Sequence, residues 1–340
     1  MPLINFDEIG PTIIAFFNNK GGVGKTSLVY HLSWMFEQLQ CRVVAADLDP
    51  QANLTAAFFD EDKMEKIWDE TDKPHTVYGC VQPIIKGTGD IQEPILEPIS
   101  DHLALLVGDL SLSGFEDELS NQWPDCLDGK ERAFRVISAF WRILQRAGEN
   151  FAADAILIDL GPNLGALNRA ALISADYVVI PLSPDLFSLQ GLKNLGPTFR
   201  RWRIEWKERL KKNPDPKLKL PEGKMTPAGY IILQHSVRLD RPARAYERWI
   251  AKMPKTYRQY VLDEKGGERI LVEKDKNCLA LLKHYRSLMP MAQEARKPIF
   301  ALNPADGAIG SHLGSVENAK NDFMQLAREI ATRTGVDLPS

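Results

Sequence analysis

The stretch Lys20-Gly21-Gly22-Val23-Gly24-Lys25-Thr26-Ser27 decides the fold of this chain of 340 residues. An apolar run over residues 12–17 comes just before it and predicts a short strand buried on both faces. After it, apolar residues recur at helical spacing from Leu28 to Leu39, which predicts a helix with one buried face. A strand, a glycine-rich turn and a helix in this order predict a loop that binds phosphate groups.

The residue types in this loop have physical roles. The glycines let successive backbone N–H groups converge on anionic oxygens, and the start of the helix adds the positive end of its dipole. We expect Lys25 to reach the β- and γ-phosphates of ATP, and the Thr26 hydroxyl to ligate Mg²⁺. All residues from Lys20 to Ser27 are therefore predicted to line a site for ATP and Mg²⁺.

Lys20 has no place in the usual pattern G-x-x-x-x-G-K-[ST]. Asn19 stands at the first glycine position of that pattern, and Lys20 precedes the glycine pair. Because Lys25 already serves the phosphates of its own loop, a second lysine has a use if it serves a phosphate bound by a neighbouring subunit. The alternative is a solvated surface lysine.

The loop begins an alternation of strands and helices. A helix is predicted over 166–175, a helical pattern runs from Phe134 to Leu144, and further apolar runs predict strands at 42–46, 103–107, 155–159, 177–181 and 229–234. This alternation is typical of an α/β fold with a doubly wound, mostly parallel sheet flanked by helices. Asp159 ends a buried strand, where a carboxylate is costly without a cation, so we expect it to face Mg²⁺. A cap for the following turn is the alternative.

The segment Lys20 to Ser27 resembles the deviant Walker A loop of the ParA/MinD family of P-loop ATPases. Asp47-Leu48-Asp49-Pro50-Gln51-Ala52-Asn53 resembles the D-x-D-P-Q-x-N segment of the ParA branch. The resemblance implies a P-loop NTPase fold and a homodimer that forms around ATP, with Lys20 reaching across it. It also implies that Asp49 positions the attacking water near the metal and that Asp159 is the Walker B carboxylate. These roles suit phosphoryl transfer, which depends on positioning and positive charge.

The resemblance covers residues 12–55, 152–200, 228–237 and 285–332, and it implies that Met289 and Pro290 lie beside the adenine base. Gly161 departs from it, because the family more often has proline there. We expect a single domain over 1–340, with insertions at about 60–150, 203–228 and 250–280.

Basic residues gather in one part of the chain. Residues 199–224 contain ten basic and four acidic residues, a local charge of +6 in a chain whose net charge is −3. This suits a surface for nonspecific DNA, with Arg200, Arg201, Arg203, Lys207, Lys211 and Lys212 as the candidate contacts. A solvated charged helix is the alternative. Trp202 and Trp206 are expected to anchor this segment in the core, and four arginines from Arg238 to Arg248 form a second basic cluster.

The resemblance implies a slow ATPase that is stimulated by a ParB-like or cargo-adaptor partner and that partitions or positions DNA or another cargo. Two alternatives remain: a MinD-like ATPase that cycles on a membrane, and a regulatory or assembly module switched by nucleotide. The first would need a C-terminal amphipathic helix, whereas we expect Phe323, Leu326 and Ile330 to be core residues. Met1–Gly10 shows no signal-peptide pattern and no apolar run is long enough for a membrane span. We therefore expect no membrane partner and a cytoplasmic, nucleoid-associated protein.

Overall fold

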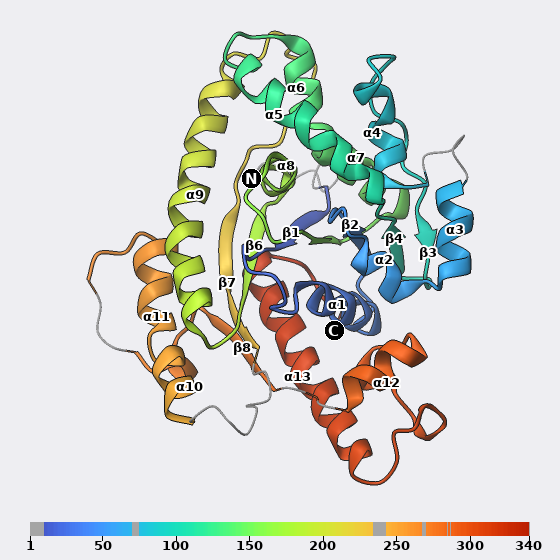
Figure 1. The fold of residues 1–340 in the computed structure, drawn as a ribbon, viewed down its shortest axis with the longest axis vertical. Helices are drawn as coiled ribbons and strands as arrows, with labels where there is room; N and C mark the ends of the chain where they lie inside the picture. Colours follow the sequence, from blue (N-terminus) through green and yellow to red (C-terminus); the bar gives the residue numbers. More distant parts are fainter. Residues whose placement is uncertain are drawn as a thin grey trace, which may run out of the picture.

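The computed structural model describes residues 10–69, 75–233, 243–266, 270–283, 285 and 287–339. Its core is an eight-stranded sheet in the order β3-β4-β2-β5-β1-β6-β7-β8 (Figure 1). Neighbouring strands are parallel, except that β3 runs antiparallel to β4. This confirms the predicted doubly wound, mostly parallel sheet. The strands are β1 Thr12–Phe16, β2 Val43–Asp47, β3 Glu97–Pro98, β4 Leu103–Leu106, β5 Ala155–Asp159, β6 Tyr177–Leu182, β7 Thr226–Leu233 and β8 Cys278–Leu282.

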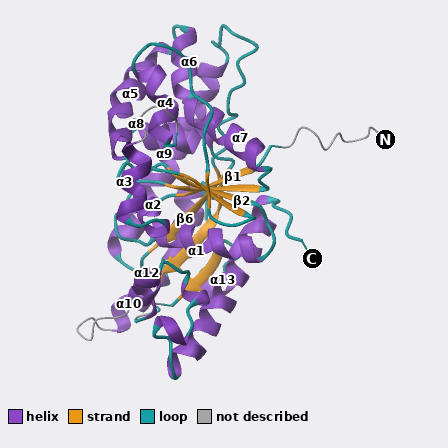
Figure 2. Cartoon of the chain, turned by 90° about the vertical axis from the view of Figure 1, so that its right-hand side faces the viewer, coloured by secondary structure: helices purple, strands orange, loops and turns teal. Residues whose placement is uncertain are grey.

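Helices cover both faces of the sheet, and Figure 2 shows the strands as a central fan between them. The alternation of side chains along β1 divides the core, since Ile13 and Ala15 belong to one apolar cluster and Ile14 and Phe16 to the other. The α-helices are α1 Lys25–Gln38, α2 Asn53–Phe58, α3 Glu61–Asp69, α4 Val77–Ile85, α5 Phe115–Asp125, α6 Glu131–Ile137, α7 Ala139–Phe151, α8 Ala166–Ser174, α9 Leu186–Leu210, α10 Ala243–Ile250, α11 Met253–Thr256, α12 Leu288–Ala295 and α13 Ser311–Thr334. The short helices are η2 Leu110–Gly114, η3 Tyr257–Val261, η4 Val272–Lys274, η5 Ile299–Ala301 and η6 Pro304–Asp306.

The two faces are built from different parts of the chain. One cluster joins α5, α7, α8 and α9 to the sheet, and the other joins α1 and α13. Phe323, Leu326 and Ile330 on α13 are buried in the second cluster, as predicted. Among the described residues, no helix combines the length and the hydropathy that a membrane span requires.

Three features differ from the sequence prediction. No strand was predicted beyond residue 234, but the chain there contributes β8 beside β7. The helical pattern from Phe134 to Leu144 is divided between α6 and α7 at Ser138, whose hydroxyl donates to the carbonyl oxygen of Phe134 at 2.6 Å. The segment predicted to be an insertion at about 60–150 is largely helical where it is described.

The basic segment from 199 to 224 begins inside α9 rather than on an element of its own. This helix has 25 residues and continues through Pro197 to Leu210, and β7 then begins at Thr226. Trp202 and Trp206 are buried as predicted, and the Trp206 indole donates to the carbonyl oxygen of Pro221 at 2.9 Å. Gln234, Arg238 and Arg241 lie outside the described residues.

Candidate nucleotide site

The register of the three central strands places the candidate residues side by side. In β5, Asp159 is aligned with Phe16 of β1 on one side and with Asp47 of β2 on the other. Both carboxylates therefore lie at the carboxyl edge of a parallel sheet, where ligands of doubly wound folds bind. The glycine-rich loop leaves β1 at this same edge and ends in α1.

The loop has the backbone that its sequence predicts. Gly22 and Gly24 have φ angles of 69° and 81°, in the left-handed region that glycine adopts without strain. Gly24 is the N-cap of α1 and carries no side chain, so the first N–H groups of the helix remain available to an anion. The buried Asn18 fixes the start of the loop: its amide donates to the carbonyl oxygen of Pro181 in β6 at 2.7 Å, and its side-chain oxygen accepts the Lys20 N–H at 3.0 Å.

Lys25 lies inside the loop and is buried. Its ammonium donates to the carbonyl oxygen of Lys20 at 3.5 Å. Burial lowers the pKa of Lys25, and the negative charges of Asp159 and Asp49 oppose this shift. Lys25, which is expected to contact the phosphates, therefore lies near the carboxylates of Asp159 and Asp49.

Asp159 is fully buried, and neither of its carboxylate oxygens has a hydrogen-bond partner among the described residues. Burial raises its pKa to about 8, the charge of Asp47 adds to the shift, and Thr26 opposes it. A buried, unpartnered carboxylate is costly, so this side chain and the neighbouring Thr26 fit a hydrated Mg²⁺. In the described ranges no three His, Cys, Asp or Glu side chains form a metal cluster.

Asp47 is a further buried carboxylate, to which the sequence analysis assigned no role of its own. It accepts the backbone N–H and the hydroxyl of Thr55, both at 2.8 Å. Burial raises its pKa to about 7, although the hydrogen bonds from Thr55 oppose the shift. Because Asp47 adjoins Asp159 in the sheet, the two carboxylates repel each other when both are ionised. Its place in the D-x-D motif was the signal available in the sequence.

Asp49 lies beside Gly161, the position where the sequence departs from the family pattern. Asp49 accepts the Gln51 N–H at 3.1 Å, and a Cβ added at Gly161 would stand 3.0 Å from the Asp49 carboxylate. Gly161 therefore leaves room for Asp49. Pro162 follows, and its ring approaches the Cβ position of Gly21 to 3.8 Å, so this segment packs against the phosphate loop.

The segment after Asp159 is held by two residues that the sequence analysis missed. The Asn168 amide donates to the carbonyl oxygens of Gly161 and Asn163 at 2.9 and 2.7 Å. The Glu116 carboxylate, from α5, accepts the backbone N–H groups at the start of α8. No local sequence pattern marks Glu116, since it lies 50 residues from Ala166.

Lys20 is partly exposed, whereas Lys25 is buried inside the phosphate loop. The Lys20 ammonium pairs with the carboxylate of Asp185, and it lies 5.8 Å from the centre of the Phe187 ring. Asp185 is the N-cap of α9 and accepts the Ser188 N–H at 2.9 Å. The sequence analysis did not find this pair, whose members are 165 residues apart.

The residues predicted beside the adenine lie in α12. Met289 packs against the apolar cluster that contains α1 and α13, and Pro290 is exposed. Among the described residues no hydrogen bond joins either of them to the phosphate loop, so their role beside the base stays a prediction.

The predicted DNA contacts divide into two groups along α9 and its end. Arg200 donates to the carbonyl oxygen of Tyr260 at 2.7 Å and pairs with Asp263 at 3.6 Å, so it holds α9 to η3. Arg203 is half-buried, and burial lowers its pKa. The exposed members of the set are Arg201, Lys207, Lys211 and Lys212.

The chain is similar in sequence to known proteins. The sequence family described as "AAA domain" matches residues 11–212. The chain is 30% identical to an uncharacterised protein of Methanocaldococcus jannaschii, over 69% of this chain and 78% of that protein. It is 32% identical to the sporulation initiation inhibitor protein Soj of Bacillus subtilis and 30% identical to the chromosome partitioning protein ParA of Myxococcus xanthus. Each of these two matches covers 55% of this chain, and they cover 64% of Soj and 57% of ParA.

Solved structures share the fold. A protein from Corynebacterium diphtheriae superposes with a TM-score of 0.67 and 22% identity, over 95% of this chain and 98% of its own. A putative plasmid partition protein from Borrelia burgdorferi bound to AMPPNP has a TM-score of 0.54 and 21% identity, over 93% of this chain and 99% of its own. The family match, the relatives and the shared fold together show that the chain belongs to the ParA/MinD family of P-loop ATPases.

Proposed function

We propose that this protein is an ATPase that dimerises around ATP and binds DNA nonspecifically as the dimer. Hydrolysis is slow, is stimulated by a ParB-like or cargo-adaptor protein, and resets the cycle that partitions or positions DNA or another cargo. The proposal places the protein in the cytoplasm, on the nucleoid.

In this proposal the residues at the carboxyl edge of the sheet have different roles in ATP binding and hydrolysis. Lys25 and the N-terminus of α1 hold the phosphates, and Thr26 and Asp159 hold the hydrated Mg²⁺. When bound, Mg²⁺ neutralises charge on the phosphate oxygens. Asp49, beside Gly161, orients the attacking water. The placement of these groups around one loop supports ATP hydrolysis in this site.

The position of Lys20 is the observation that supports dimerisation most directly. Its ammonium lies on Asp185 at the rim, while Lys25 occupies the interior of the loop. Beside it, Phe187 and Leu186 are 72% and 54% exposed, which is unusual for large apolar side chains next to a ligand site. A second copy of the chain would cover this apolar rim and bring phosphates that Lys20 can reach once it leaves Asp185.

DNA binding and a partner protein are supported by the relatives and by local charge. Soj and ParA are named for sporulation control and chromosome partitioning. The chain presents exposed cations for such contacts, among them Arg201 and Lys207 on α9.

The two alternatives have less support. A membrane-cycling ATPase needs an exposed apolar helix face, whereas Phe323, Leu326 and Ile330 of α13 are buried in the cluster that contains α1. A nucleotide-switched module would use the same site and would not depend on turnover. If the Asp49→Ala variant cannot hydrolyse ATP but still performs every cellular role of the protein, the nucleotide-switched module is the correct alternative.

Duplex DNA of arbitrary sequence tests the proposal. With ATP and Mg²⁺ we expect the protein to bind such DNA in a fluorescence anisotropy titration, with affinity falling steeply as salt rises. With ADP we expect at least a tenfold lower affinity. Equal affinity in the two nucleotide states contradicts the proposal.

A further inference from the structure

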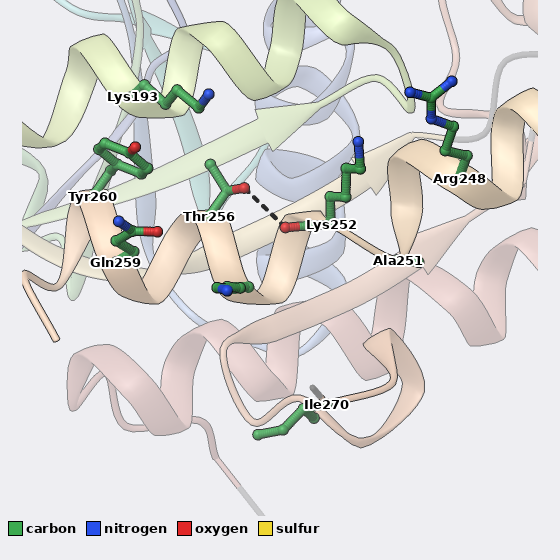
Figure 3. A pocket seen from close by; sticks show the side chains of 9 residues that line it. Lys193, Arg248, Ala251, Lys252, Thr256, Gln259, Tyr260 and Ile270 are labelled. Atoms are coloured by element: carbon green, nitrogen blue, oxygen red, sulfur yellow. Dashed lines mark hydrogen bonds between the residues drawn. The ribbon is translucent and has the colours of Figure 1, made fainter. Parts of the chain in front are cut away.

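A pocket of about 580 Å³ lies between α9 and the segment formed by α10, α11 and η3. Figure 3 shows Lys193 on α9 facing this segment, with the amino group of Lys252 pointing toward α9 and Arg248 at one end. Lys255 and Tyr260 also line the pocket. Of these elements, α9 also adjoins the nucleotide site, because its N-cap Asp185 pairs with Lys20.

The lining is strongly positive. It contains four cations, Lys193, Arg248, Lys252 and Lys255, and no carboxylate. None of the four forms an ion pair with any residue that the structure describes. From Arg248 to Val261 the sequence has no Asp or Glu at all. Cations gathered in this way repel one another unless an anion joins them.

The walls of the pocket are held by packing, so the cations are presented on a formed surface. A Cβ at Gly196 would clash with the carbonyl oxygen of Tyr260, which shows how closely α9 and η3 approach. Arg200 donates to the same carbonyl at 2.7 Å, and the Thr256 hydroxyl donates to the carbonyl oxygen of Lys252 at 2.9 Å (Figure 3). Aromatic rings support the charged groups: Lys193 lies 5.7 Å from the Tyr260 ring.

We infer that this pocket, which we call the anion pocket (Lys193, Arg248, Lys252 and Lys255), binds the phosphate backbone of DNA. The inference rests on the proposed function and deepens it by locating the DNA contacts there rather than at the far end of α9. Lysine ammonium groups without acidic neighbours recognise backbone phosphates without reading bases.

Its place in the fold links it to the nucleotide. Lys193 follows Asp185, the partner of Lys20, by eight residues, which is roughly 12 Å along a helix. Lys211 follows Asp185 by 26 residues, roughly 39 Å away, where α9 meets α5 through Arg209 and Trp123. In Figure 1, α9 runs from α10 and α11 at one end to α5 and α6 at the other. A dimer that closes over the phosphate loops therefore brings two anion pockets near its interface and leaves the far ends of α9 apart.

The test compares two charge reversals of equal size, Lys252→Glu/Lys255→Glu in the anion pocket and Lys211→Glu/Lys212→Glu at the far end of α9. All four lysines are exposed. Duplex DNA binding is measured with ATP and Mg²⁺ at several salt concentrations, and ATP-dependent dimerisation is measured separately by sedimentation. We expect the pocket variant to bind DNA at least tenfold more weakly. The slope of log affinity against log salt concentration should also become shallower by about 2, since each phosphate contact contributes about 0.9 to that slope. We expect the α9 variant to stay within twofold of wild type, Lys252→Arg/Lys255→Arg to bind normally, and all variants to dimerise.

Two results overturn the inference while leaving the proposed function intact: wild-type DNA affinity in the pocket variant, or an equal loss in both charge-reversal variants. Titration with phosphatidylserine vesicles can give a third result that overturns the inference. If the pocket variant loses vesicle binding and keeps DNA binding, the site serves a membrane surface instead. Failure of the proposed function looks different, because the wild-type protein would then bind DNA equally weakly with ATP and with ADP.

Discussion

The Lys20 ammonium pairs with the carboxylate of Asp185, and that carboxylate also caps α9 through the N–H of Ser188. Lys20 must leave this partner before it can reach a phosphate in a second subunit. In the proposed dimer this pair would oppose association and would tie the start of α9 to the state of the nucleotide site.

Asp185→Asn should strengthen the ATP-dependent dimer. Asparagine keeps the cap, because its side-chain oxygen still accepts the Ser188 N–H, but it loses the charge that holds Lys20. The two side chains are 28% and 22% exposed, so we expect each pair to contribute up to about 1 kcal/mol. Two pairs are released per dimer, which predicts roughly fivefold to thirtyfold tighter association. Sedimentation velocity with ATP measures this, and an unchanged or weaker dimer would show that Asp185 does not restrain Lys20.

Gly161→Ala should slow hydrolysis and spare ATP binding. The added Cβ would stand 3.0 Å from the Asp49 carboxylate and displace the group that orients water. We expect kcat to fall about tenfold, since small misplacements of a positioning group are costly. Gly114→Ala is the matched control, because no atom lies within 4 Å of the Cβ position there. If both variants hydrolyse ATP at the wild-type rate, Asp49 does not position the water.

Asp159 should make the stability of the protein without nucleotide fall as pH rises. Its pKa is raised from 3.8 to about 8, so the folded state keeps a proton that the unfolded state has already lost between those values. The free energy of unfolding therefore decreases from about pH 4 to about pH 8 through this group. Thermal melts in EDTA at pH 6.0 and 8.5 measure the change in Tm, and Asp159→Asn should reduce it. A Tm difference as large in Asp159→Asn as in wild type would assign the pH dependence to other groups.

Much of the fold follows from the sequence, because buried parallel strands appear as short apolar runs. The strand at residues 155–159 is an example, with all five residues buried. Strand β8 was missed because its burial is mixed, with two of its residues buried and three half-buried, and it lies at the edge of the sheet. Residues 203–228 were predicted to be an insertion, but α9 continues to Leu210, with Trp202 and Trp206 buried.

The phosphate loop was predictable because its residues are contiguous and their chemistry is local. The residues elsewhere in the chain that contact this loop were not predictable from the sequence. Asp185 and Lys20 are 165 residues apart, and Asn18 reaches Pro181 over 163 residues, so both contacts depend on the order of strands in the sheet. The contact of Arg200 was not predicted for a similar reason: its positive charge is visible in the sequence, but the carbonyl of Tyr260 to which it donates is not.

Dimerisation driven by ATP tests the central claim most directly. The measurement is the sedimentation coefficient of the Asp49→Ala variant with ATP and Mg²⁺, with ADP and Mg²⁺, and with ATP after the further change Lys20→Ala. We predict a stable dimer only in the first case, because hydrolysis is blocked and Lys20 can reach across to the bound phosphates. A dimer that forms equally with ADP, or equally without Lys20, would contradict the account.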